Sequence, residues 1–227
     1  MIRRVWTATA RFWETDRSLS ILLLLLIVGE LVLPPLLPDR VHRGPVADLV
    51  ASLLLLAGVF AVWGERRWVF RLVLLFSAIA VPTRWGSRLV PGGELASWRA
   101  VTELAALVLL TLVVLSKVLR PGLVTRDRLQ GGIAAYLLLG LTWANAYQWA
   151  ALHDPAAFSG AVAGGAGSSQ WVYYSLVTLT TMGYGDITPV SDVARSLAVG
   201  EALSGQLYLA ILISRLVALE LRSREHA

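Results

Sequence analysis

Apolar residues along this chain gather in long runs that are bounded by charged residues, proline or glycine. A helix needs roughly 20 apolar residues to cross about 30 Å of hydrocarbon. Several segments come near that length, and we therefore expect six transmembrane helices. Their approximate bounds are 19–33, 46–63, 68–81, 100–119, 129–152 and 193–221. The last two exceed the minimum length, which predicts that they are tilted.

One further apolar segment, residues 170–181, is too short to cross a membrane. It follows a run rich in Gly, Ala and Ser at 159–169, which predicts a flexible outer loop. Because the short segment is aromatic and ends at glycines, we expect a helix that enters the membrane and turns back. Non-helical backbone is tolerated at membrane depth only where protein buries it or where it lines a water-filled cavity. The pattern therefore predicts a pore.

The composition agrees with a membrane environment. Hydrophobic residues make up 56% of the 227 residues, charged residues only 15%, and the mean hydropathy is +0.66. These values are typical of an integral membrane protein. The chain has no cysteine, which excludes disulfides and thiolate metal sites. The net charge of +5 does not indicate a nucleic-acid partner, because the basic residues form short clusters between the apolar segments.

The basic clusters predict the orientation in the membrane, since cytoplasmic loops retain Lys and Arg. An N terminus inside the cell places more of these residues inside than outside. We therefore expect a multi-pass protein of the cell membrane with both termini in the cytoplasm, and no cleaved leader. One inner cluster precedes the fifth expected helix, and it either contacts anionic lipid headgroups or only sets the topology. Its members are Lys117, Arg120, Arg126 and Arg128.

The short segment leads into the most informative motif of the chain, Thr181-Met182-Gly183-Tyr184-Gly185. This motif resembles the selectivity filter of the potassium channel superfamily, in which four TVGYG loops supply carbonyl oxygens that replace the hydration shell of K⁺. The resemblance is strong over residues 129–221 and weak before them. Two features depart from the commonest pattern. Met182 replaces a branched residue, and Tyr173-Tyr174 stands where many relatives carry Trp.

Glycine explains how such a motif binds ions. Gly183 and Gly185 can adopt positive φ, which lets alternate residues aim their carbonyl groups toward one axis. The resemblance implies that Tyr184 points away from this axis and braces the filter, with a hydrogen bond to Tyr173, Tyr174 or Thr178. It also implies that Asp186 concentrates cations at the outer mouth, and that K⁺ is the bound ion, with no other cofactor. The implied K⁺ ligands are the carbonyl groups of Thr181, Met182, Gly183 and Tyr184, with the Thr181 hydroxyl.

The sixth expected helix holds three candidate features. Gly205 is either a hinge or a site of close packing between helices. A second feature is one apolar face that either lines the ion path, with a constriction that gates by dewetting, or faces lipid and other helices. It consists of Gln206, Leu209, Ile213 and Val217. Glu201 lies at membrane depth, and we favour a structural hydrogen bond to the helix that supports the filter. Its protonation is left open.

Four helices before a two-helix pore match the architecture of voltage-gated channels, but the charges of a voltage sensor are missing. Such a sensor needs several Arg at every third position, because each charge contributes only about 2.3 kcal/mol per 100 mV. The fourth expected helix carries no basic residue before Lys117, and the third carries Arg71 alone. Glu30 and Glu103 either anchor the helices through arginines or form a ligand site. The candidate arginines are Arg84, Arg88 and Arg99.

The sequence thus predicts an all-α membrane protein with a four-helix domain at 1–128 and a pore domain at 129–227. The pore domain would contain an outer helix, a pore helix, the filter and an inner helix. One filter strand cannot surround an ion, so we expect a homotetramer. The predicted function is passive, K⁺-selective conduction without steep voltage gating. The alternatives are a weakly selective cation channel, a potassium transporter subunit and a nonconducting scaffold. An enzyme is not expected, because no nucleophile or metal-ligand spacing lies near His42, His153 or His226.

Overall fold

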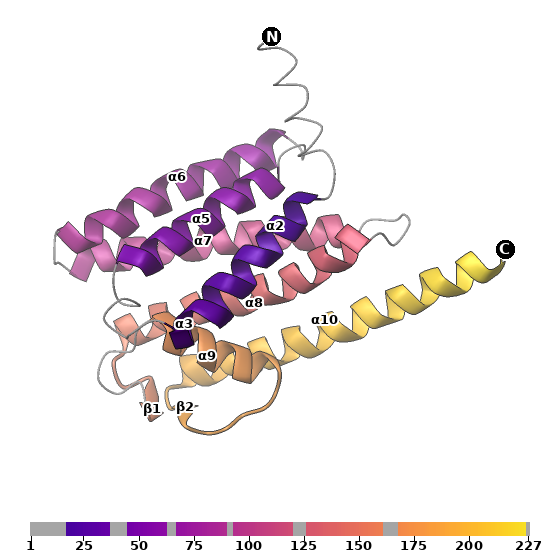
Figure 1. Cartoon of the computed structure of the whole chain (residues 1–227). Coiled ribbons are helices and arrows are strands. Elements are labelled where there is room, and N and C mark those ends of the chain that lie inside the picture. The colour runs from indigo at the N-terminus through magenta and orange to yellow at the C-terminus, as the bar shows by residue number, and fades with distance from the viewer. Residues whose placement is uncertain are drawn as a thin grey trace, which may run out of the picture.

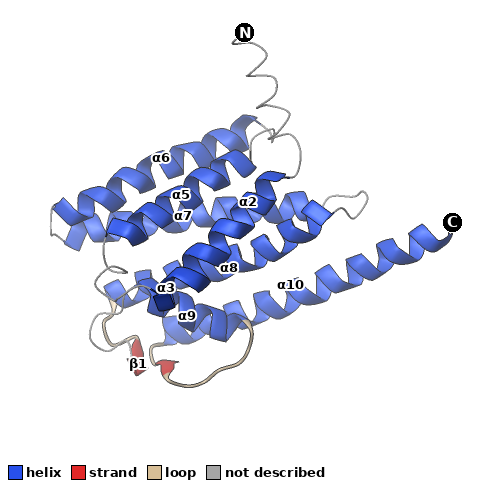
Figure 2. Cartoon of the chain, in the orientation of Figure 1, coloured by secondary structure: helices blue, strands red, loops and turns tan. Residues whose placement is uncertain are grey.

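The computed structural model describes residues 17–36, 45–62, 67–89, 93–119, 126–160 and 168–225, which are mostly helical (Figure 2). The first half contains α2 (Arg17–Leu26), the π-helix η1 (Ile27–Val32), α3 (Leu33–Leu36), α5 (Pro45–Ala61), α6 (Arg67–Leu89) and α7 (Gly93–Val118). The second half contains α8 (Arg126–His153), β1 (Phe158–Gly160), α9 (Ser168–Leu179), β2 (Ile187–Pro189) and α10 (Asp192–Glu225).

Three helices are long and apolar enough to cross a membrane, within Arg67–Ser87, Ser97–Val118 and Asp192–Arg215. Two further apolar segments, Leu19–Val32 and Pro45–Ala61, are shorter. Helix α8 is long, but it is not among the three, and it carries amide side chains at Asn145 and Gln148. The chain is therefore a helical membrane protein, and six complete spans stay a prediction.

Helix α6 runs through Pro82 to Leu89, so the predicted end of this helix near residue 81 is wrong. A proline inside a helix removes one backbone hydrogen bond and crowds the preceding turn. The neighbouring Thr83 hydroxyl contacts two carbonyl groups of that turn, Ile79 O at 2.9 Å and Ala80 O at 3.0 Å. The helix thus continues, and it carries Arg84 back toward the protein interior.

The first helical segment also continues beyond the predicted end at Pro34-Pro35, as far as Leu36. Pro34 has no N–H to donate, which disturbs the regular bonding pattern of an α-helix. The Leu33 amide donates instead to the Val28 carbonyl, five residues back, as in a π-helix.

The helices form two groups (Figure 1). Helices α5, α6 and α7 lie together, α2 crosses α8, and α9 lies between α8 and α10. The second half of α10 extends away from the other helices in this view. The largest fully buried side chains include Leu19, Leu22, Leu26, Leu110, Leu138 and Tyr147. The core therefore joins both halves of the chain, and the boundary at residue 128 stays a prediction.

A short two-stranded ladder adds to the helices, although an all-α fold was expected. β1 and β2 are antiparallel, with Phe158 opposite Pro189 and Gly160 opposite Ile187. Gly160 has φ of 96°, and a Cβ there would lie 1.9 Å from Asp186 O. Only glycine fits this position. The first residues of the predicted outer loop are therefore a strand beside the filter motif, while 161–167 lie outside the described residues.

Candidate functional site

Helix α9 ends directly before the filter motif, and the chain folds back onto the end of the helix. The Met182 amide donates to Val177 O at 2.9 Å, and the Thr181 amide donates to Thr178 O at the same distance. These bonds satisfy carbonyl groups that a helix end otherwise leaves free. The motif therefore begins from the C-terminal end of α9, where the helix dipole favours a cation.

The backbone of the motif alternates in conformation. Thr181, Gly183 and Gly185 have φ of 59°, 56° and 78°, whereas Met182 and Tyr184 between them have ordinary negative φ. Where residues with positive and negative φ alternate, successive carbonyl groups can point to the same side of the chain. Among the residues that the structure describes, Thr181 is the only non-glycine with positive φ. Strain at such a residue is typical of functional sites.

The side chains of the motif are exposed in a single chain. Met182 is 64% exposed and Tyr184 is 65% exposed. Within the described part of the chain, Tyr184 has no hydrogen-bond partner, so the expected bond to Tyr173, Tyr174 or Thr178 is absent. The Tyr173 hydroxyl instead lies close to Asp186, and this interaction raises the pKa of the Tyr173 hydroxyl. This pair ties the outer end of the motif to α9.

Tyr174 belongs to a buried aromatic cluster behind the motif. Its ring lies 4.8 Å from that of Tyr147 on α8 and 5.7 Å from that of Phe158 on β1, measured between centroids. Phe158 also packs edge-on against Trp171 at 4.9 Å. Such edge-to-face contacts hold α9 in a fixed orientation. The sequence analysis missed Tyr147 and Phe158, because no local motif connects them to the filter.

Glu201 on α10 is completely buried, and it forms hydrogen bonds with two other helices. Its Oε2 accepts from the Tyr147 hydroxyl of α8, and its Oε1 contacts the Ser175 hydroxyl of α9. The Ser175 Oγ also lies 2.6 Å from Gly140 O. These contacts are of the structural kind that the sequence analysis favoured. The contribution of Glu201 to the filter itself stays a prediction.

Gly205 packs directly against the end of α9. A Cβ at this position would lie 2.5 Å from Leu179 O, which is closer than atoms can approach. The Tyr136 hydroxyl of α8 reaches the same carbonyl at 3.4 Å. One residue further on, the Gln206 amide lies 3.5 Å from the Thr181 hydroxyl. The structure thus gives Gly205 a packing role, and a hinge at this position stays a prediction.

The predicted gate face of α10 is exposed in a single chain. Leu209, Ile213 and Val217 are 37%, 59% and 54% exposed. Helix α10 is continuous through these residues. An exposed apolar face in one chain agrees with either an ion path or a neighbouring subunit or lipid, and the role of this face stays a prediction.

The buried charges of the first half form one cluster around Arg84. Its Nε lies 2.7 Å from Asp48 Oδ1 on α5, and its Nη1 is paired with Glu103 on α7. Arg99 adds a weaker contact with Glu103 at 3.7 Å. The predicted pairing of Glu103 with Arg84 and Arg99 is confirmed. The sequence analysis missed Asp48, whose position in the first turn of α5 is an ordinary one for an acidic residue.

The structure describes only some side chains of the predicted lipid-binding cluster. Lys117 Nζ lies 3.4 Å from Ala61 O at the end of α5, where a cation interacts favourably with the helix dipole. Arg120 and the side chain of Arg126 lie outside the described residues. The side chain of Arg88, a candidate partner of Glu30 and Glu103, also lies outside them. Lipid contacts therefore stay a prediction. Arg215 of α10 donates to Leu119 O at the end of α7, a second contact of this kind.

Comparison with known proteins places this geometry in a wider context. Residues 135–220 match a family model described as "Ion channel". A rice protein, "Two pore potassium channel c" from Oryza sativa subsp. japonica, is 34% identical over 94 residues. That match covers 41% of this chain and 19% of the rice protein. No solved structure matches. The family evidence points to a channel and not to an enzyme, as the sequence predicts.

Proposed function

Because residues 135–220 match an ion-channel family model and part of the chain is similar to a potassium channel, we propose that the chain belongs to the potassium channel superfamily and conducts K⁺ passively and selectively. In this proposal α8 is the outer helix, α9 the pore helix and α10 the inner helix. Residues 181–184 line the ion sites with their backbone carbonyl groups, and the Thr181 hydroxyl adds a further oxygen. K⁺ is the ion that these groups bind, and no other cofactor is required.

The alternating φ angles of residues 181, 183 and 185 are the observation that carries this proposal. A row of carbonyl groups on one side of the chain is the arrangement that replaces water around a cation. The match of the rice potassium channel to this chain supports K⁺ as that cation.

A homotetramer completes the proposal. One chain carries one row of carbonyl groups, and a closed ring around an ion requires several copies related by rotation. The exposure of Tyr184 supports this assembly, since a large aromatic side chain at membrane depth is expected to pack against protein. We propose that a neighbouring chain covers Tyr184 and supplies the partner that a single chain lacks.

The proposed channel is not steeply voltage-gated, and both of its termini lie in the cytoplasm. Arg84 supports weak voltage dependence, because it is buried and held by two carboxylates. A charge in that position cannot move through the field without breaking both pairs. The expected conductance–voltage curve is shallow, and a steep, saturating curve would contradict this part of the proposal.

Potassium flux into liposomes tests permeation. Purified protein in liposomes with a K⁺ gradient should take up tracer K⁺, and Ba²⁺ should block the uptake. A matched preparation of Gly185→Ala serves as the control, because the added Cβ strains a residue with positive φ. Flux that persists in the Gly185→Ala liposomes would show that ions pass elsewhere. The absence of flux from wild-type protein would favour the nonconducting scaffold.

A further inference from the structure

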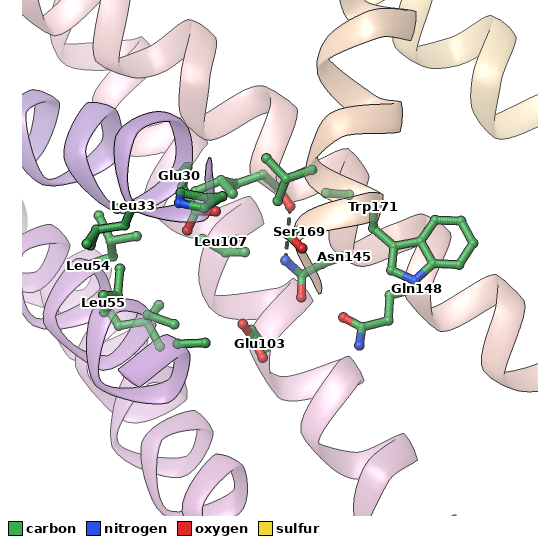
Figure 3. A pocket seen from close by; sticks show the side chains of 18 of the residues that line it. Glu30, Leu33, Leu54, Leu55, Glu103, Leu107, Asn145, Gln148, Ser169 and Trp171 are labelled. Carbon is green, nitrogen blue, oxygen red and sulfur yellow. Dashed lines mark hydrogen bonds between the residues drawn. The ribbon is translucent and has the colours of Figure 1, made fainter. Parts of the chain in front are cut away.

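A cavity of about 70 Å³ lies between the first half of the chain and the pore helix (Figure 3). One side is formed by η1, α5, α6 and α7, and the other by α8 and α9. Its walls are mainly apolar, with Leu54, Leu55, Leu107 and Trp171 among them. Its polar side chains are Glu30, Arg84, Glu103, Asn145, Gln148 and Ser169. The cavity therefore combines an apolar wall with a small set of convergent polar groups, as ligand sites do.

Most of the charged side chains that the structure describes around this cavity are paired with one another. Arg84 is paired with Asp48 and Glu103, and Arg99 contacts Glu103 a second time. Among the residues that the structure describes here, three carboxylates therefore face two guanidinium groups. Glu30 interacts with Arg84 through space, but within the described ranges it has neither an ion pair nor a hydrogen bond. Glu30 is partly buried, and a cation beside its carboxyl group would stabilise the charged form.

Two amide side chains add hydrogen-bond acceptors to the same space. The Asn145 Nδ2 donates to Leu141 O at 3.0 Å, which leaves its carbonyl oxygen for another donor. Gln148 lines the cavity without a hydrogen-bond partner among the residues that the structure describes. The best occupant therefore carries a positive charge and donates several hydrogen bonds, as a primary ammonium does.

Size and chemistry restrict the occupant further. A cavity of this volume has room for a few water molecules or for a molecule of a few heavy atoms. A divalent metal ion fits poorly, because the described residues contain no cluster of three or more Asp, Glu, His or Cys placed to hold one. The apolar wall favours an occupant with a short hydrocarbon group beside its charge.

We propose that this cavity binds a small primary alkylammonium ion. The ammonium group faces Glu30 and the side-chain oxygens of Asn145 and Gln148, and the alkyl group lies against Leu54 and Leu107. Because the occupant contacts both η1 and α8, its binding strengthens the attachment of the first half of the chain to the pore segment. This site is separate from the ion pathway and does not depend on conduction.

A primary ammonium has two possible sources, a free amine or the headgroup of an ethanolamine lipid. Thermal unfolding of the purified full chain in lipid-free detergent tests the first source. Ethylammonium chloride is compared with NaCl at equal ionic strength and constant K⁺, so that any filter site stays occupied. The second source is tested by comparing bilayers that contain ethanolamine lipid with bilayers that contain only choline lipid.

Four proteins are compared. They are wild type, Glu30→Gln, the cavity-filling variant Ala51→Leu, and the control Asp192→Asn, whose exposed carboxylate lies at the start of α10. Ethylammonium should raise the midpoint of wild type and of the control by about 2–4 °C. Glu30→Gln should lose this rise because it removes the negative charge that faces the ammonium group. Ala51→Leu should lose it because the larger side chain fills the cavity. The readout is the ligand-induced change, so a variant with altered intrinsic stability remains informative.

Stabilisation by ethanolamine lipid alone, absent in Glu30→Gln and Ala51→Leu, would support the site and assign the lipid as its source. An equal rise in all four proteins would overturn the proposal, because the amine would then act on the filter or the surface. Absence of a rise with either source would also overturn it. Neither result depends on whether the chain conducts K⁺.

Discussion

The Ser175 hydroxyl of the pore helix contacts the Glu201 carboxyl group of α10, and both side chains are completely buried. Ser175 also lies 2.6 Å from Gly140 O, yet a serine hydroxyl has only one hydrogen to donate. Both contacts are full hydrogen bonds if Glu201 is protonated and donates to Ser175, while Ser175 donates to Gly140. The Tyr147 hydroxyl then donates to the other oxygen of Glu201. In this arrangement one neutral carboxyl group joins α8, α9 and α10.

A neutral side chain of the same shape should therefore replace Glu201. In Glu201→Gln the amide nitrogen donates to Ser175 and the amide oxygen accepts from Tyr147. We expect Glu201→Gln to unfold within about 1 kcal/mol of wild type, and Glu201→Ala to lose about 3 kcal/mol through its cavity and unpaired hydroxyls. Denaturant unfolding in detergent measures both. Equal losses in the two variants would show that the charged form of Glu201 is the one that matters.

The second prediction follows from the positive φ of Gly185. Alanine at this residue strains the backbone, so Gly185→Ala should reduce K⁺ flux at least about 10-fold, corresponding to roughly 1.4 kcal/mol. Gly132→Ala is the matched control, because Gly132 is helical and a Cβ there makes an ordinary contact of 3.5 Å with the Tyr208 hydroxyl. Flux from both variants is measured in the same liposomes. Wild-type flux from Gly185→Ala would contradict the assignment of residues 181–185.

The close approach of Gly205 to Leu179 O makes a third prediction. A methyl group at Gly205 must displace the end of the pore helix, because the atom it meets belongs to the backbone. We expect Gly205→Ala to lose about 1–3 kcal/mol of stability and to conduct less K⁺. Thermal unfolding and flux are measured together. A stable variant with altered open probability would instead favour the hinge.

The prediction of the fold from the sequence worked where the signal was local. Apolar runs located the helices, and the Gly183-Tyr184-Gly185 motif located the turn after α9. The sequence could not locate contacts between distant residues. Tyr147 lies 54 residues from Glu201, and Ser175 lies 26 residues from it, so no spacing rule connects them. Asp48 was not predicted as a partner of Arg84 for the same reason, since the two residues are 36 positions apart in the sequence.

Other differences have local physical causes. Pro82 indicated the end of a helix, but the neighbouring Thr83 hydroxyl contacts two carbonyl groups of the preceding turn, and the helix continues. The strands β1 and β2 contain three residues each, too few for an alternating pattern to be recognised. Tyr184 lacks the expected partner within one chain, and we propose that a neighbouring chain supplies it.

Arg84 makes a fourth prediction. Arg84→Met removes the guanidinium group that pairs with the buried Asp48 and Glu103 carboxylates, which should cost about 3–5 kcal/mol. Arg71→Met on the same helix is the matched control, because Arg71 is exposed and its loss should cost less than about 1 kcal/mol. Denaturant unfolding compares the two variants. Equal, small effects would contradict an anchoring role for Arg84.

The fifth prediction concerns the predicted gate face of α10. If Ile213 forms part of a hydrophobic constriction, Ile213→Asn should hydrate it and raise the resting open probability several-fold. Ile211→Asn is the matched control, because Ile211 is similarly exposed but lies on another face of the helix. Single-channel recording measures both variants. An unchanged open probability in Ile213→Asn would remove this residue from the gate.

The reversal potential under bi-ionic conditions tests the central claim most directly. Purified protein in a planar bilayer, with K⁺ on one side and Na⁺ on the other, should reverse at a potential that corresponds to strong preference for K⁺. Ba²⁺ should block the current, and Gly185→Ala should abolish it or its selectivity. A reversal potential near zero, with equal K⁺ and Na⁺ permeability, would contradict the proposal and indicate a weakly selective cation channel.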